Sequence, residues 1–167
     1  FSLQRFYRHI QAAEHVRHEA EAICARLKQA IETSLAVLVH IENGHREEKA
    51  GNLNGALREF IQASMTAPEN GYIVRHIAKY YAAMGNYGDS VKWWERLLSQ
   101  DNSPKYYRYY ASALARWGRF DLAEENYAKA YNGDPDDPET LIEIGDFFLA
   151  RGLGRRALQN YELAATQ

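Results

Sequence analysis

Apolar residues among the first 36 positions recur at spacings of three, four or seven. They are Leu3, Phe6, Ile10, Ala13, Ala20, Cys24, Leu27 and Ile31. This period places them in one stripe along a helix, and the segment has no proline or glycine that would end it. The sequence therefore predicts one long amphipathic helix over residues 1–36.

Three interpretations of this stripe stay open. It can pack on the following segment as an N-terminal cap, pair with a second copy as a dimerising coiled coil, or be the stub of a neighbouring domain. Arg17 and Ser34 interrupt the seam of such a coiled coil. The end of the helix is also open, because Thr33 or Ser34 would suit the cap of a fresh helix, whereas an uninterrupted helix would run to about Asn43.

The apolar pattern of the remaining chain repeats around four glycines that lie 34, 33 and 34 residues apart, Gly51, Gly85, Gly118 and Gly152. Five residues after each glycine lies a small residue, and an aromatic residue follows four positions later. Seven residues before each glycine lies another small residue; these are Gly44, Ala78, Ala111 and Gly145. Because glycine tolerates positive φ where a helix ends, each unit is predicted to be two helices joined by a turn.

At these residues the chain resembles the tetratricopeptide repeat (TPR) family, whose unit is a helix–turn–helix of about 34 residues. In the second repeat, the large residues of the family's first helix correspond to Val74, Ile77 and Tyr81, and its small residue corresponds to Ala78. The resemblance implies an all-α fold, a right-handed α-solenoid of about four repeats. We place the TPR domain at 37–167, with repeats at about 37–70, 71–103, 104–137 and 138–167.

The two end repeats depart from the family pattern. His40, Asn43 and Glu47 stand in the first repeat where the family has large apolar residues. The last repeat ends at its second helix, without the polar capping helix that usually covers a terminal repeat. Three alternatives follow for this end: the native protein continues, the end docks on a partner, or it docks on a second copy. A homodimer would then form through residues 1–36 or through the uncapped C-terminal repeat.

Composition narrows the classes of function. Hydrophobic residues make up 46% of the 167 positions, and the formal net charge is −2. A chain so near neutrality has no overall attraction to nucleic acid or to anionic membranes. No apolar run approaches the ~20 residues of a membrane span. The single cysteine, Cys24, fits a reducing compartment, so we expect a cytoplasmic location, with Cys24 buried on the stripe.

No group of residues indicates catalysis, a metal site or a cofactor. His15 and His18 are three residues apart but lack a third ligand. The Gly152-Leu153-Gly154 stretch follows a helix and not a strand, unlike a phosphate-binding loop. We therefore expect that the chain is not an enzyme and holds neither a metal nor a cofactor.

The resemblance implies a concave groove, lined by the first helix of each repeat, that takes up partner segments. The corresponding residues of the second and third repeats are Tyr72, Arg75, His76, Lys79, Lys105, Arg108, Tyr109, Ser112 and Arg116. A secondary set in the fourth repeat is Glu139, Glu143 and Asp146. The centre of the groove is thus basic and contains tyrosine, and Arg75 and Arg108 are predicted to bind carboxylates of a partner.

The chain is predicted to be a protein–protein interaction module, as an adaptor, assembly factor or secretion-type chaperone, whose partner bears acidic residues. The chaperone-tail clamp of some family members is not expected, because only Lys105 matches it. The alternatives are binding of RNA or single-stranded nucleic acid by stacking tyrosines, and regulatory sensing of a peptide. Tyr107 and Tyr110 are expected to fill the core, whereas Tyr106 has no predicted place.

Overall fold

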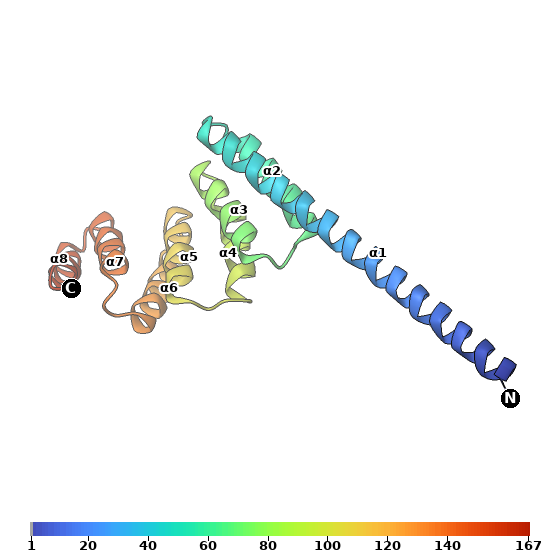
Figure 1. Cartoon of the computed structure of the whole chain (residues 1–167). Coiled ribbons are helices and arrows are strands. Elements are labelled where there is room, and N and C mark those ends of the chain that lie inside the picture. The colour runs from blue at the N-terminus through green and yellow to red at the C-terminus, as the bar shows by residue number, and fades with distance from the viewer. Residues whose placement is uncertain (1) are drawn as a thin grey trace.

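The computed structural model describes residues 2–167, and these residues form eight α-helices and no strand (Figure 1). The helices are α1 (Ser2–Lys49), α2 (Leu53–Thr66), α3 (Gly71–Ala83), α4 (Tyr87–Leu98), α5 (Pro104–Arg116), α6 (Phe120–Gly133), α7 (Pro138–Ala150) and α8 (Gly154–Ala164). They pack in successive pairs, α1 with α2, α3 with α4, α5 with α6 and α7 with α8. The fold is an all-α helical repeat, as the spacing of the glycines predicts.

Each pair turns at one of the four spaced glycines, and these are the residues with positive φ, from 74° to 80°, among those described. At the first turn the amide of Gly51 donates to the carbonyl of Glu48, and the amide of Asn52 donates to the carbonyl of Glu47. The other three turns repeat this pair of hydrogen bonds, which is the Schellman ending of a helix. Glycine is thus required at each turn by its backbone conformation.

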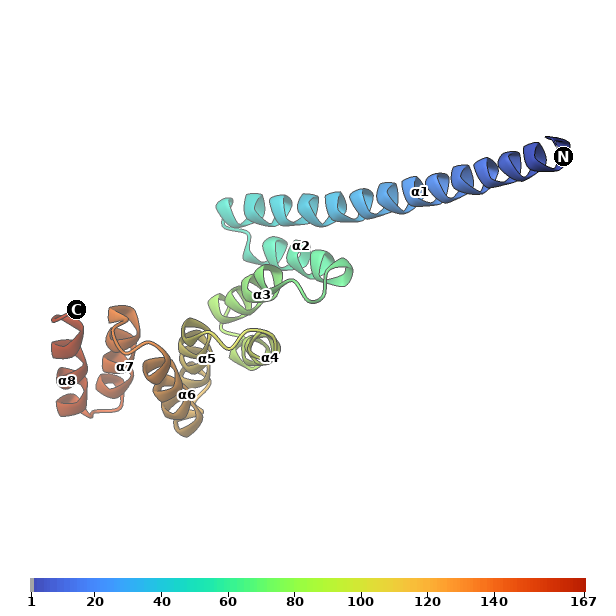
Figure 2. The ribbon, with the colours of Figure 1, turned by 60° about the horizontal axis from the view of Figure 1, so that its bottom comes forward.

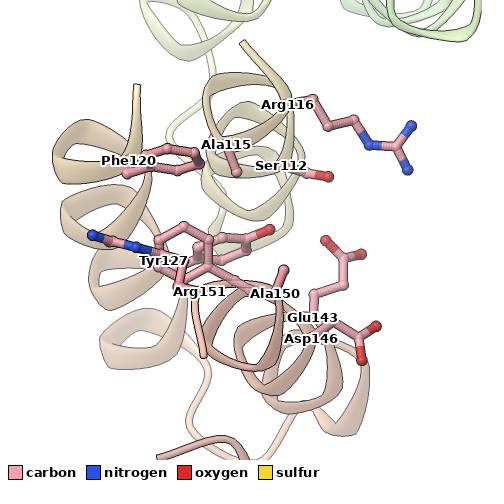
Figure 3. Close-up of a pocket in the computed structure, with 10 residues that line it drawn as sticks. Ser112, Ala115, Arg116, Phe120, Tyr127, Glu143, Asp146, Ala150 and Arg151 are labelled. Atoms are coloured by element: carbon pink, nitrogen blue, oxygen red, sulfur yellow. The ribbon is translucent and has the colours of Figure 1, made fainter. Parts of the chain in front are cut away.

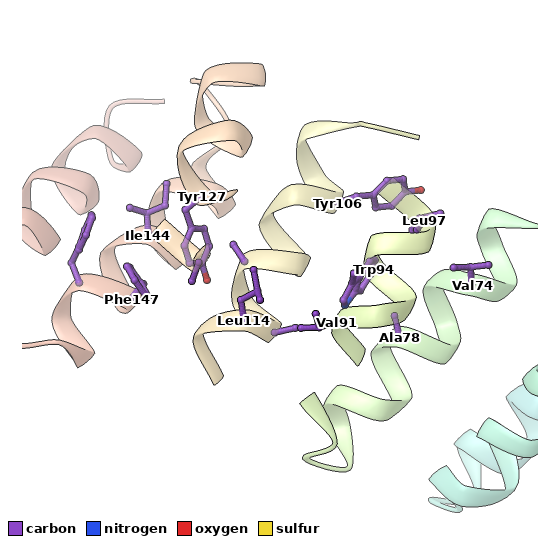
Figure 4. Packing of buried hydrophobic residues seen from close by; sticks show 14 of the residues in the cluster. Val74, Ala78, Val91, Trp94, Leu97, Tyr106, Leu114, Tyr127, Ile144 and Phe147 are labelled. Atoms are coloured by element: carbon purple, nitrogen blue, oxygen red, sulfur yellow. The ribbon is translucent and has the colours of Figure 1, made fainter. Parts of the chain in front are cut away.

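The second helix of each pair packs its aromatic residue against the small residue of the first helix. Phe60 is fully buried against Gly44, where an added Cβ would lie 2.5 Å from its ring. Trp94 is buried in a core with Ala78, and this core continues into the last repeat at Phe147 (Figure 4). The predicted role of the small residues, which is to let paired helices approach closely, is confirmed.

Helix α1 is uninterrupted over 48 residues. Its residues 37–49 pack on α2 as the first helix of the first repeat, and the remainder projects away from the repeats (Figure 2). Neither Thr33 nor Ser34 begins a new helix, because the Thr33 hydroxyl donates to the carbonyl of Gln29 within the same helix, at 2.8 Å. The helix ends at Lys49, beyond Asn43, and the predicted domain boundary after residue 36 lies inside it.

Residues 2–36 are all exposed, and no other described helix lies against them (Figures 1 and 2). The structure therefore does not support the interpretation of this segment as a cap folded onto the first repeat. Cys24, expected to be buried, is exposed, because the stripe that carries it has nothing packed on it here. None of the helices in residues 2–167 combines the length and the apolar composition that crossing a membrane requires.

The polar positions of the first repeat are used in packing α1 on α2. His40 Nδ1 lies 2.8 Å from Glu59 Oε2, and the carboxylate of Glu47 accepts a hydrogen bond from the Asn52 side chain at 2.7 Å. Polar pairs thus occupy places that apolar contacts fill in the other repeats.

The tyrosines of α5 differ in part from their predicted places. Tyr106 is buried in the core, whereas Tyr107 and Tyr110 are half-buried, and the hydroxyl of Tyr110 donates to Glu95 at 2.8 Å. The prediction that Tyr107 and Tyr110 fill the core is therefore only partly correct. Because α5 packs on α4 as well as on α6, a second face of α5 is buried, and the pattern within one repeat does not show this.

Candidate partner-binding groove

A hollow of about 600 Å³ lies between α5, α6 and α7 (Figure 3). We call it the main hollow; it is lined by Ser112, Ala115, Arg116, Phe120, Tyr127, Glu143, Asp146, Phe147, Ala150 and Arg151. Part of its wall is apolar and is formed by the rings of Phe120 and Phe147 together with two alanines. The polar part places Arg116 on α5 opposite Glu143 and Asp146 on α7 (Figure 3).

A smaller hollow of about 160 Å³ adjoins the main hollow and lies between α3, α4 and α5. It is lined by Lys79, Ala82, Trp94, Tyr109, Ser112, Ala113 and Arg116. Ser112 and Arg116 line both hollows, so the two form one continuous surface, which we call the groove. The rings of Trp94 and Tyr109 are stacked in the smaller hollow, with centroids 5.4 Å apart.

The groove brings together half of the residues predicted for it. Six of the twelve line the two hollows: Lys79, Tyr109, Ser112, Arg116, Glu143 and Asp146. The other six lie outside their walls: Tyr72, Arg75, His76, Lys105, Arg108 and Glu139. The residues inside come from three different repeats, so the stacking of the repeats creates this surface.

Arg108 is already engaged within the chain. Its side chain is 7% exposed, and its guanidinium nitrogens lie 2.7 Å from Glu139 Oε2 and 2.9 Å from Glu143 Oε1. A third carboxylate, of Asp137, lies 3.9 Å from its Nε. The structure therefore does not support the prediction that Arg108 binds a carboxylate of a partner, because acids at the start of the next repeat already contact its guanidinium. Its contacts tie the third repeat to the fourth.

The same contacts perturb the acids around Arg108. Burial raises the pKa of Glu143 above its ordinary range, and the charge of Arg108 offsets only part of this effect. The balance is opposite at Asp137, where hydrogen bonds from Thr140 and from the Glu139 amide outweigh burial and lower the pKa. Asp146 accepts a hydrogen bond from the Tyr161 hydroxyl at 2.7 Å. The acidic residues of the fourth repeat, Glu139, Glu143 and Asp146, thus already make contacts within the chain.

Four of the predicted cations take part in no ion pair among the described residues: Arg75, Lys79, Lys105 and Arg116. Arg75 lies over the ring of Tyr72 at 5.4 Å, and Lys105 lies over the ring of Tyr106 at 5.0 Å. Lys79 and Arg116 line the smaller hollow. A carboxylate can therefore bind between these two cations without displacing an existing ion pair.

Tyr72 and His76 belong to a separate aromatic cluster between the first and second repeats. The ring of His76 stacks on Phe60 with centroids 4.9 Å apart, and its Nδ1 donates to the carbonyl of Tyr72 at 2.8 Å. His45 Nε2 lies 2.6 Å from the Tyr72 hydroxyl. Burial, assisted by the charge of Arg75, lowers the pKa of His76. These side chains pack the two repeats together.

The sequence prediction missed the aromatic wall of the main hollow. Phe120 and Tyr127 come from α6, the second helix of its repeat, and a groove built from first-helix positions leaves them out. Phe120 is 43% exposed, and the guanidinium of Arg151 lies 5.0 Å from its ring. A phenylalanine two residues after the turn glycine, on a helix that already has a core aromatic at Tyr127, was the available signal.

No family model and no curated protein matches the chain. Solved structures do resemble it. MamA MSR-1 aligns with a TM-score of 0.66 and 19% identity over 78% of this chain and 75% of that one. Cut9-Hcn1 of the APC/C aligns with a TM-score of 0.70 and 18% identity, over 78% of this chain and 25% of that one. A tetratricopeptide repeat protein from Parabacteroides merdae aligns with a TM-score of 0.68 and 16% identity, over 77% of this chain and 52% of that one.

At these levels of identity the similarity concerns the fold and not the partners. The four turns, the close pairing of helices and the solved relatives agree with one another. The chain therefore has the fold of the tetratricopeptide repeat proteins.

Proposed function

We propose that the chain is a protein-interaction module, of the adaptor or assembly-factor type, that binds a segment of a partner protein in the groove. The observation that carries this proposal is the pair of unpaired cations, Lys79 and Arg116, beside an open hollow with an aromatic wall. The TPR fold supports it, because stacked repeats of this kind create extended binding surfaces.

The groove favours a segment that carries an acidic residue next to a large apolar residue. The carboxylate lies between Lys79 and Arg116, beside the ring of Tyr109. The apolar side chain enters the main hollow and packs on Phe120 and Phe147. This assignment keeps the predicted acidic partner but moves its contacts from Arg108 to Arg116.

These two anchors set the expected strength of binding. Burial of one large apolar side chain contributes roughly 1.5–3 kcal/mol. A charge-assisted hydrogen bond contributes about 1.5–3 kcal/mol. Ordering the segment offsets part of this gain, so a single short segment is expected to bind with a dissociation constant on the order of micromolar or weaker.

The first prediction concerns charge reversal in the groove. Peptides selected from a display library against the chain are expected to share an acidic residue beside an apolar one. Lys79→Glu combined with Arg116→Glu should weaken their binding at least about 30-fold, because attraction at two sites becomes repulsion. Calorimetric titration measures the change.

The matched control is Arg155→Glu combined with Lys129→Glu, which makes the same change in net charge at residues that line neither hollow. Equal binding by the groove variant and the control would reject the groove assignment. Selection of RNA with a steep salt dependence, in place of acidic peptides, would favour the nucleic-acid alternative.

A further inference from the structure

We propose that the exposed apolar face of α1 is the interface of a homodimer in which the α1 helices of two copies pair antiparallel. Its large side chains are 40–68% exposed; they are Leu3, Phe6, Ile10, Val16, Ile23, Leu27 and Ile31. We call this face the α1 seam. Residues 2–36 extend about 52 Å at the rise of an α-helix. A helix of this kind owes most of its stability to packing of its apolar face, so the seam requires a partner.

The seam continues an interface that already exists within the chain. Val37, Ile41 and Gly44 of α1 pack against α2. Counting back in sevens from Val37 and Ile41 leads along the seam through Ala30, Ile23 and Val16 in one row and Ser34, Leu27, Ala20, Ala13 and Phe6 in the other. A third row beside these two consists of Leu38, Ile31, Cys24, Arg17, Ile10 and Leu3, and Leu38 is 60% exposed. The first two rows are therefore covered by α2 at their C-terminal ends, and all three rows are exposed along residues 2–36. A seven-residue period of apolar positions is typical of helices that supercoil around a partner, and among the positions named here only Ser34 and Arg17 interrupt it with a polar or charged side chain.

The seam is complementary to itself when two copies run antiparallel. In a two-fold symmetric dimer, residue i of one copy faces residue j of the other, and j faces i. When the facing numbers sum to 37, the row of Phe6 and Leu27 faces the row of Ile10 and Ile31, and Arg17 and Ala20 form the central pair. Leu3 then faces Ser34, and Val16 and Ile23 flank the paired rows. The facing pairs are Phe6–Ile31, Ile10–Leu27, Ala13–Cys24 and Arg17–Ala20.

Arg17 favours the antiparallel arrangement over a parallel one. A parallel pair in register would place Arg17 against Arg17 of the second copy and would bring both α2 helices to the same level of the seam. In the antiparallel pair Arg17 faces the short side chain of Ala20, so its guanidinium extends to solvent, where Glu21 of its own helix lies 3.7 Å away. The repeats of the two copies then lie at opposite ends.

The size of the interface is sufficient. Seven large apolar side chains on each copy, at roughly 60–120 Å² each, remove on the order of 1,000 Å² from water. This area is near the lower limit for a specific complex. A dimer of micromolar strength is therefore expected.

Cysteine cross-linking tests the pairing and its direction. Three variants are oxidised in a glutathione redox buffer: the native chain, Ala13→Cys combined with Cys24→Ala, and Ala13→Cys alone. In the antiparallel dimer only the last forms a disulfide-linked dimer, because position 13 faces Cys24 and neither position faces itself. Linkage of all three variants would overturn the direction and indicate a parallel pair, and linkage of none would overturn the register.

Sedimentation tests the dimer itself. Leu27→Glu should raise the dimer dissociation constant at least about 100-fold, since two buried leucines are lost from each dimer. The control Gln29→Glu adds the same charge on the opposite side of α1 and should leave the constant within about threefold. The proposal would be refuted if the native chain stayed monomeric at roughly 100 μM, about 100-fold above the expected dissociation constant. Equal dimer dissociation constants for the two variants would also refute it.

Two further measurements distinguish loss of the dimer from unfolding of the repeats and from loss of groove binding. Near-UV circular dichroism reports the folding of the repeats, because all three tryptophans lie in them, at Trp93, Trp94 and Trp117. Binding of selected peptides in the groove should be unchanged in Leu27→Glu. The dimer and the groove can therefore fail independently.

Discussion

Arg108 stands at a groove position of the repeat pattern, yet its side chain holds two repeats together. Sequence spacing gave the helix and the face on which it lies. The spacing did not reveal the contacts, because Glu139 and Glu143 come from the next repeat, 31 and 35 residues later. Basic residues in the third repeat and acidic residues at the corresponding positions of the fourth were the available sign that ion pairs within the chain occupy part of the groove.

The second prediction follows from this burial. Arg108→Met should lower the free energy of unfolding by about 2–3 kcal/mol, because it leaves the half-buried Glu143 and its neighbours without their cation. Urea denaturation measures the change. Arg75→Met, at a residue without an ion pair, should cost less than about 0.5 kcal/mol. Equal losses for the two variants would show that the Arg108 contacts do not stabilise the chain.

The third prediction concerns pH and His76. The pKa of His76 is lower in the folded chain than its ordinary value, because burial disfavours the charged ring. Its contribution to stability is therefore complete above about pH 6.5 and is lost as the pH falls through the lowered folded-state pKa. The melting temperature should fall between about pH 7 and pH 5.5, and His76→Gln should flatten that fall. An unchanged slope in the variant would exclude His76 as the cause.

At the scale of the element, the turn glycines were the residues from which the helix boundaries could best be predicted. They indicate where the first helix of each pair ends, because glycine adopts their positive φ at less cost than residues with a side chain. The length of α1 was less predictable. Its first 43 residues contain neither glycine nor proline, so the sequence offered no clear stop, and hydroxyl residues such as Thr33 suit a cap and a helix interior alike.

The fourth prediction tests one turn. Gly85→Ala should cost about 1–2 kcal/mol of stability, because its φ of +77° is unfavourable for alanine although nothing lies within 4 Å of the added Cβ. Gly154→Ala adds the same methyl group in equally open space but at a helical position, and it should be neutral or slightly stabilising. Thermal unfolding of both variants separates backbone strain from crowding. A neutral Gly85→Ala would contradict the role given to this turn.

At the scale of the whole molecule, stacking repeats produced the features that the pattern of one repeat could not show. The main hollow needs walls from α5, α6 and α7, and the smaller one needs α3, α4 and α5. A periodic pattern predicts which residues of each repeat lie on the groove side. It does not predict which of these residues meet across the junctions between repeats, so it included Lys79 and Arg116, which line the smaller hollow, but omitted Phe120.

The two proposed binding surfaces differ in character. The groove is polar at its rim and apolar at one wall, which suits a segment that is released again. The α1 seam is an exposed apolar face on a single helix, interrupted at Arg17 and Ser34, and a face of this kind suits the proposed symmetric association. In the proposed dimer, one pair of α1 helices would hold two grooves apart.

Binding in the groove is tested most directly by NMR mapping of a selected acidic peptide on the isotope-labelled chain. The largest chemical-shift changes should fall on Lys79, Tyr109, Ser112, Arg116 and Phe147, with intermolecular contacts between the apolar side chain of the peptide and the Phe147 ring. Changes confined to α1 or α8, with these groove residues unaffected, would contradict it.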